Sequence, residues 1–249
     1  MPGRDEPSFW GDLRRSAVVW LRRPWLPAIS VALASGGFAS GGVLWPVSLI
    51  VLLMTTGWVG TERIIYLRAF RGLPVRRREL VRMTLAFVPR YALLGGLFAL
   101  LMLPATIALS AFRSPAGEDP NLSGFFWYVG AVGFTIGVAL TFVTPALAFT
   151  TRRIREALSI GFRMISTEWP TAAPYVVVPP TLSFAILLLA APWNDRALFT
   201  SIAITMGSTL LNLWFKGATA AFYLRRMSVG DDGAAFLHRP LPANPDVPT

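Results

Sequence analysis

The chain alternates between long apolar stretches and short segments that hold almost all of its charge. The apolar stretches have 19 to 38 residues without a charged side chain and lie at 24–61, 91–112, 120–151, 169–194 and 197–215. A helix needs about 20 apolar residues to cross a bilayer. None of the stretches alternates apolar and polar positions as a barrel strand would. The pattern therefore predicts an all-α, polytopic membrane bundle.

The longest stretch, 24–61, contains ASGGFASGG at 34–42 and could cross the membrane once or twice. As one straight helix it would be about 57 Å long, against a hydrocarbon core of about 30 Å. Short cytoplasmic loops carry the excess of Lys and Arg. A turn at 34–42 places 20 of the 23 basic residues on one side and two on the other, whereas a single crossing puts a large Arg cluster outside. Two crossings are therefore expected, with the second helix restarting at Trp45-Pro46.

The resulting prediction is six transmembrane helices in three hairpins, near 24–38, 44–62, 88–111, 124–150, 171–192 and 197–224. Both termini are expected in the cytoplasm. An N-terminal segment, 1–23, precedes a membrane domain, 24–227, and a Pro-rich tail, 228–249, is expected to be disordered. Only one of the 23 basic residues is Lys, which is typical of GC-rich bacterial genomes. The expected location is the bacterial inner (plasma) membrane.

The N-terminal residues also fit a second interpretation. A basic start, about ten apolar residues and Ala32-Leu33-Ala34 resemble a secretory signal with its cleavage site. Cleavage there would leave the rest of the topology unchanged, so charge does not distinguish the two. The long leader before the apolar part favours a first membrane span.

Each predicted hairpin follows a segment whose apolar positions recur at helical spacing, as in helices that lie in the membrane interface. These positions are Phe9, Leu13, Ala17, Trp20 and Leu21 in the first segment, Leu80, Val81, Thr84, Phe87 and Val88 in the second, and Ile154, Leu158, Gly161, Phe162 and Ile165 in the third. The chain is therefore either three repeats of surface helix plus hairpin, or three unrelated hairpins that resemble one another by chance.

Lys216 is the basic residue that lies inside the last predicted span, nine positions before Arg225 and so about 13 Å deeper at the helical rise. Asn212 lies one turn earlier on the same face. An ionisable residue within a span is a candidate functional site, but a lysine can also snorkel to the interface or bond a neighbouring helix. If Lys216 is paired, Glu62 at the end of the second span is the expected partner.

The fifth predicted span is interrupted by Pro170, Pro174, Pro179, Pro180 and Pro192. Transporter binding sites are often built from broken helices. The alternative is a set of kinks that neighbouring helices tolerate. It is favoured because no acidic or cation-coordinating residue accompanies these prolines.

The sequence offers no recognisable set of catalytic side chains. All 13 acidic residues lie in loops, tails or span ends, Cys is absent, and the single His238 lies in the tail. These residues form no metal-ligand cluster, no Walker-type phosphate loop is present, and a Ser or Thr nucleophile would have no visible base. We therefore expect no enzymatic activity, no metal and no cofactor.

The densest basic patch is RGLPVRRREL at 71–80. Anionic lipid headgroups at the cytoplasmic face would attract it, by about 1 kcal/mol per basic residue. The candidate lipid contacts are Arg71, Arg76, Arg77, Arg78 and Arg82, although these residues also suffice as a topology signal alone. A net charge of +10 would suggest nucleic acid in a soluble chain. Its placement beside apolar stretches argues for membrane lipids and against a nucleic-acid partner.

Four segments carry a resemblance to a known group: GTERIIYLRAFRG (60–72), TPALAF (144–149), REALSIGFR (155–163) and AFYLRRM (221–227). They resemble bacterial six-span proteins that include the membrane domain of some glycerophosphodiester phosphodiesterases. The likeness covers most of residues 9–227 through loose motifs, and SVGDD (228–232) only approximates the acidic ending of that family. It implies the six-span fold and no phosphodiesterase activity, because no catalytic domain is present.

Two functions remain open. The first is a non-enzymatic scaffold or accessory subunit that contacts lipids, another membrane protein or a second copy of itself. The second is a small transporter or lipid-handling protein. A transporter should contain a polar cavity lined by Asn212 and Lys216, whereas a scaffold should have a packed apolar interior.

Overall fold

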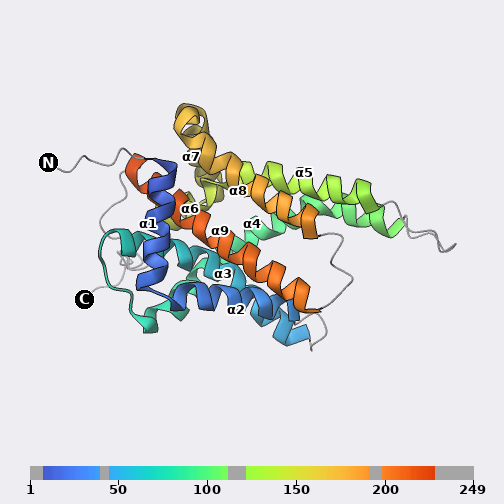
Figure 1. Ribbon diagram of the computed structural model, residues 1–249, viewed down its shortest axis with the longest axis horizontal. Coiled ribbons are helices and arrows are strands. Elements are labelled where there is room, and N and C mark those ends of the chain that lie inside the picture. The colour runs from blue at the N-terminus through green and yellow to red at the C-terminus, as the bar shows by residue number, and fades with distance from the viewer. Residues whose placement is uncertain (1–7, 40–44, 112–121, 191–197, 228–249) are drawn as a thin grey trace, which may run out of the picture.

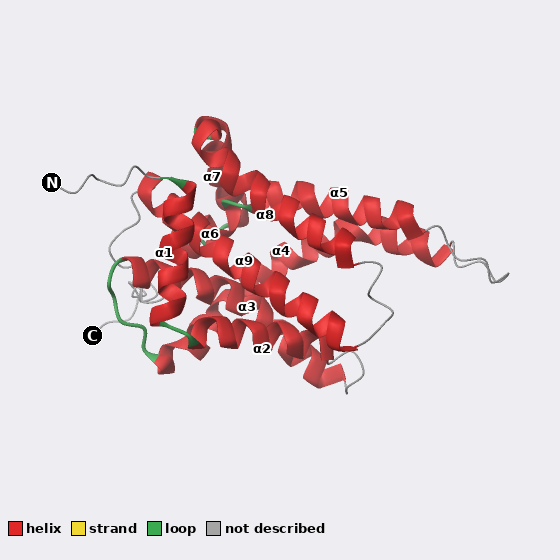
Figure 2. Ribbon diagram, in the orientation of Figure 1, coloured by secondary structure: helices red, strands yellow, loops and turns green. Residues whose placement is uncertain are grey.

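The computed structural model describes residues 8–39, 45–111, 122–190 and 198–227, and every regular element in these ranges is a helix (Figure 2). The predicted all-α class is therefore confirmed. In chain order the helices are α1 (Phe9–Arg22), α2 (Trp25–Ala39), α3 (Trp45–Phe70), α4 (Arg77–Ala111), α5 (Leu122–Leu140), α6 (Val143–Phe149), α7 (Ile154–Thr167), α8 (Trp169–Ala190) and α9 (Leu198–Arg226).

Two helices of the described ranges are long and apolar enough to cross a membrane alone, over Pro46–Phe70 in α3 and Arg78–Leu101 in α4. A third candidate span is the pair Gly130–Leu140 and Val143–Phe149, which bends by 41° at its break. Trp25–Gly36 in α2 is apolar but shorter. The chain thus has the character of a membrane protein with two or three candidate spans among its described residues, and the six predicted spans stay a prediction.

The longest apolar stretch forms two helices rather than one. α2 ends at Ala39 and α3 begins at Trp45, the predicted restart, while the connection between them lies outside the described residues. The two helices contact each other, with Gly36 of α2 facing Val51 of α3. The first Gly pair, Gly36-Gly37, is helical, so the break falls later than the centre of ASGGFASGG.

The second predicted surface helix is not a separate element. α4 continues through Pro89 without a break, so the segment at 80–88 and the third predicted span form one helix. Pro89 costs a backbone hydrogen bond, but the same face of α4 is buried on both sides of it. Thr84 and Phe87 before the proline and Tyr91 after it all pack inward, so tertiary packing overrides the helix-breaking tendency.

The fourth predicted span is divided, whereas the fifth is one continuous helix within the described residues. The fourth, 124–150, is divided into α5 and α6, whereas α8 continues through Pro174, Pro179 and Pro180. Within the described residues the fifth helix is therefore continuous, in agreement with the favoured interpretation of tolerated prolines and not with a broken helix. The break at Thr141-Phe142 follows packing, because Phe142 and Val143 are fully buried and Val143 lies against Gly161 of α7.

Two predicted surface helices, α1 and α7, are separate elements. Ser8 caps α1, since its Oγ accepts a hydrogen bond of 3.0 Å from the backbone N–H of Gly11. The inward face of α1 differs from the predicted one. Asp12 and Ser16 are buried, whereas Leu21 is 82% exposed, because α1 packs against α9 through polar contacts.

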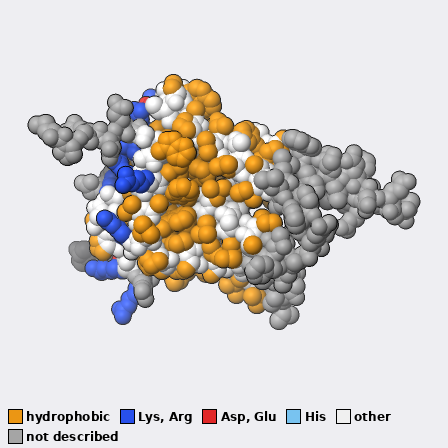
Figure 3. All heavy atoms as spheres, viewed as in Figure 1, with side chains coloured by type: hydrophobic (Ala, Val, Ile, Leu, Met, Phe, Trp, Pro, Cys, Tyr) orange, Lys and Arg blue, Asp and Glu red, His pale blue; other side chains and the backbone are white. Residues whose placement is uncertain are grey.

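α3 occupies the centre of the bundle and contacts α2, α4, α6 and α9. In Figure 1, α5 and α8 run side by side along one edge, and α2 lies at the opposite edge with α9 between them. Figure 3 shows an apolar band across the molecule and basic side chains gathered at the end that carries α1 and the α3–α4 connection. That segregation is typical of a membrane protein with one basic surface.

Candidate functional site

Three helices, α2, α3 and α9, meet around an ion pair in the middle of the bundle. The Lys216 Nζ in α9 lies 2.6 Å from Oε2 of Glu62 in α3, and this contact is the pairing expected for Lys216. The second carboxylate oxygen of Glu62 accepts a 2.6 Å hydrogen bond from Ser30 of α2. Ser30 in turn accepts from the indole N–H of Trp58 at 2.8 Å. Glu62 is 3% exposed, so the network satisfies a charge that is removed from water.

Arg63, the next residue along α3, is almost completely buried, with 4% of its surface exposed. Its Nη2 donates a 2.5 Å hydrogen bond to the Thr144 hydroxyl of α6. Its Nε and Nη1 are buried without a hydrogen-bond partner among the described residues. A buried guanidinium with unsatisfied N–H groups is costly, so it marks a place where a further acceptor would bind.

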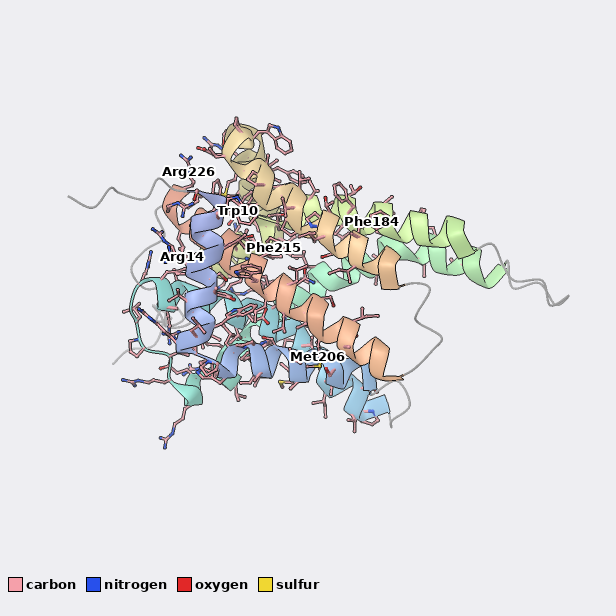
Figure 4. All side chains as sticks on the ribbon, in the orientation of Figure 1. Trp10, Arg14, Phe184, Met206, Phe215 and Arg226 are labelled. Carbon is pink, nitrogen blue, oxygen red and sulfur yellow. The ribbon has the colours of Figure 1, made fainter. Side chains whose placement is uncertain are left out.

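Arg63 lies in the wall of a cavity of about 410 Å³. Three sides of the cavity are formed by α5, α8 and α9, and Figure 4 labels one wall residue on each of the last two, Phe184 on α8 and Phe215 on α9. The polar side chains of the wall are Arg63, Thr141, Thr144, Tyr175, Ser183, Asn212, Lys216 and Thr219. No carboxylate belongs to the described wall, so its formal charge is positive.

The cavity owes its space to small residues on α5. A side chain at Gly130 would overlap the ring of Phe184, and one at Gly137 would lie 3.1 Å from Cβ of Pro180, so α5 and α8 touch at these two levels. Gly133, between them, has no atom within 4 Å of the position of an added Cβ and belongs to the cavity wall. The prolines of α8 therefore act as an apolar wall, not as a break.

Asn212 and Lys216 both reach this cavity from α9. The Oδ1 of Asn212 accepts a 3.3 Å hydrogen bond from Ser183 of α8. The structure thus brings Asn212, Lys216 and Glu62 into one region, with Glu62 behind the wall and the other two within it. Whether this region acts on a ligand stays a prediction.

A second buried ion pair fixes α1 to the bundle. Asp12 accepts two hydrogen bonds from the guanidinium of Arg225 in α9 and one of 2.6 Å from the Tyr175 hydroxyl of α8. Lower on α1, Ser16 Oγ donates to the Trp214 carbonyl at 2.9 Å, and Trp20 donates to the Tyr66 hydroxyl at 2.7 Å. α1 is therefore held by polar contacts along its whole length.

The predicted lipid contacts lie near the basic end of the molecule. Arg76, Arg78 and Arg82 are exposed, and the side chain of Arg77 lies outside the described residues. Arg71 belongs instead to a groove of about 1260 Å³ beneath α1. Other arginines of that groove are Arg14, Arg15, Arg22, Arg23 and Arg225. The basic surface therefore extends over α1, beyond the patch that the sequence singled out.

Sequence reasoning missed Arg63, Asp12 and Tyr175. Arg63 was assigned to a cytoplasmic loop because the second span was expected to end at 62, but α3 continues to Phe70 and encloses it. Asp12 does not belong to the apolar positions predicted for the first surface helix. The available signal was the pair Glu62-Arg63 itself, two opposite charges directly after 38 uncharged residues.

Comparisons with family models, with curated proteins and with solved structures give no match to this chain. The described residues bring together no group of three or more His, Asp or Glu side chains that would suit a metal ion. The cavity must therefore be interpreted from its own chemistry.

Proposed function

We propose that the protein is a membrane protein that binds and handles an amphiphilic molecule, such as a lipid, in the cavity between α5, α8 and α9. The observation that carries this proposal is the cavity wall, which contains both Asn212 and Lys216 together with Arg63. Concave sites with an apolar lining and a few convergent polar groups are the usual form of small-molecule sites. A pure scaffold was expected to have a packed apolar interior, so the cavity favours the lipid-handling alternative.

The proposal includes the finer membrane topology. Six spans in three hairpins, with both termini in the cytoplasm of a bacterial cell and the cavity within the inner membrane, agree with the gathering of basic side chains at one end (Figure 3). The resemblance to the membrane domain of glycerophosphodiester phosphodiesterases is part of the same proposal. We also propose that the protein carries out no covalent chemistry.

The proposed function can be tested with a substitution that fills the cavity without disturbing the helices around it. Gly133→Leu places a side chain where an added Cβ meets no atom within 4 Å. Gly207→Leu is the matched control, because Gly207 on α9 is equally unobstructed and does not belong to the cavity wall. Binding of phosphatidic acid and of diacylglycerol to the purified protein is measured by native mass spectrometry.

We expect Gly133→Leu to lower the bound fraction of both lipids severalfold and Gly207→Leu to leave it unchanged. If both variants are folded and bind the lipids equally, the cavity is not the lipid site and the proposed function is wrong.

A further inference from the structure

Arg63 carries a buried charge that makes no ion pair among the described residues. Both oxygens of the neighbouring Glu62 carboxylate are engaged elsewhere, one by Lys216 and one by Ser30. The hydrogen bond that Arg63 makes goes to Thr144, which is neutral, and its Nε and Nη1 have no partner among the described residues. Because Arg63 lies inside a candidate span, at Pro46–Phe70, water cannot be assumed to solvate it.

From this we infer that Arg63 holds the phosphate group of an anionic lipid at the polar end of the cavity. This inference rests on the proposed function and names the class of its ligand. An arginine binds phosphate through charge-assisted hydrogen bonds, which are stronger than neutral ones. The phosphate would supply both the missing acceptors and the missing negative charge.

The rest of the wall suits the same ligand. Lys216 is 26% exposed at its side chain and belongs to the wall, so the ammonium protons that Glu62 does not engage can bind the same anion. Thr141 and Thr219 already donate their hydroxyl protons to backbone carbonyls one turn earlier, at Gly137 and Phe215. The hydrogen-bond donors of the wall that are still available are therefore mainly the cationic side chains. Such donors favour an anionic ligand over a cation or a neutral polar group.

The apolar part of the wall suits acyl chains. The apolar wall residues include Phe134 and Leu140 of α5 and Pro179, Pro180 and Phe184 of α8. These side chains carry no charge and offer no strong hydrogen-bond donor. A lipid would thus place its phosphate at the α3–α6 contact of Arg63 and Thr144, and its chains along α5 and α8.

The experiment compares two lipids with the same acyl chains, one with and one without the phosphate. The purified full chain is titrated with phosphatidic acid or with diacylglycerol, and a third titration adds inorganic phosphate alone. The variants are Arg63→Gln and Arg63→Met. The control is Arg90→Gln, because Arg90 is a half-buried arginine of α4 that donates to the Leu147 carbonyl and is not part of the cavity wall.

We expect the unmodified chain to bind phosphatidic acid about tenfold or more tightly than diacylglycerol, as one charge-assisted contact provides. Both Arg63 variants should lose this preference while they keep diacylglycerol binding, and Arg90→Gln should retain it. Both Arg63 variants should also fold, since removal of an unpaired buried charge is not destabilising. Melting temperatures check this.

Three other outcomes are distinguishable. If Arg63→Gln and Arg63→Met keep the preference for phosphatidic acid, the inference is overturned. If the unmodified chain shows no preference and Gly133→Leu still lowers binding of both lipids, the inference fails and the proposed function stands. If inorganic phosphate displaces phosphatidic acid with equal affinity, the site takes a free anion and the lipid assignment is overturned.

Discussion

Asp12 in α1 is bonded to Arg225 in α9 through both of its carboxylate oxygens, across 213 positions of the sequence. The two partners are unequally buried. The Asp12 side chain is 2% exposed and that of Arg225 is 26% exposed. Because the two side chains are unequally buried, substitution of one partner should destabilise the protein more than substitution of the other.

Arg225→Gln should destabilise the protein more than Asp12→Asn. It leaves a buried carboxylate with only the Tyr175 hydroxyl, at a cost of about 3 kcal/mol, whereas Arg225 released by Asp12→Asn can turn to water or headgroups. Thermal unfolding in detergent and protease cleavage before α2 are the measurements. The double variant should regain most of the loss. Equal melting temperatures for the two single variants would contradict the asymmetry.

The ion pair of Lys216 and Glu62 should show the energetic coupling of a direct contact. Lys216→Glu places two carboxylates together within the bundle and should lower the melting temperature strongly. Adding Glu62→Lys should restore part of the lost melting temperature, because opposite charges then face each other again. The recovery should be incomplete, because Ser30 loses the acceptor to which it donates. A double variant no more stable than Lys216→Glu alone would show that the pair contributes nothing to stability.

The close contact of α3 and α4 should make Gly57 intolerant of any side chain. A Cβ there would overlap the Thr84 carbonyl and lie 2.9 Å from Cγ2 of Val88, so Gly57→Ala must separate two helix backbones, at a cost of about 1–3 kcal/mol. Gly95→Ala in α4 is the control, since no atom lies within 4 Å of its added Cβ. Similar unfolding temperatures for the two variants would argue against this helix contact.

The start of α7 should respond to acid through Glu156. The hydrogen bond from the Thr151 hydroxyl, 2.5 Å from Oε2, lowers the pKa of Glu156. Burial opposes this effect, and Arg153 adds a further lowering. A depressed folded-state pKa stabilises the protein above the unfolded value, about 4.3, and that contribution is lost as pH falls through the folded value. Thr151→Val should therefore raise the pKa of Glu156 in an NMR titration. An unchanged pKa would show that the bond is absent.

The elements that could be predicted from sequence are those with strong local signals. The restart of α3 at Trp45 lies where Gly and Pro punctuate the sequence, as predicted, and α8 begins at Trp169, two residues before the predicted start at 171. The continuity of α4 through Pro89 and the break before Val143 were not predicted, because buried contacts with α3 and α7 decide them. Contacts between helices leave no local pattern in the chain.

The same distinction applies to the site. Lys216 could be found because a charge within an apolar stretch is conspicuous, and its partner followed from the side of the membrane on which Glu62 was placed. Arg63 escaped notice because its environment depends on where α3 ends, and α3 continues eight residues beyond the span expected for it, to Phe70. The end of a helix depends on tertiary packing more than on local sequence, so a pattern places it only to within a few residues.

The topology can be tested directly because the chain contains no Cys, so that one introduced thiol is a unique label. Gly42→Cys lies between α2 and α3 in sequence, and Leu73→Cys lies in the exposed connection between α3 and α4. If α3 crosses the membrane with its basic end in the cytoplasm, a membrane-impermeant maleimide should label position 42 in intact cells. Position 73 should react only after permeabilisation. Labelling of both positions from the same side would mean that α3 does not cross the membrane, and the six-span topology would fail with it.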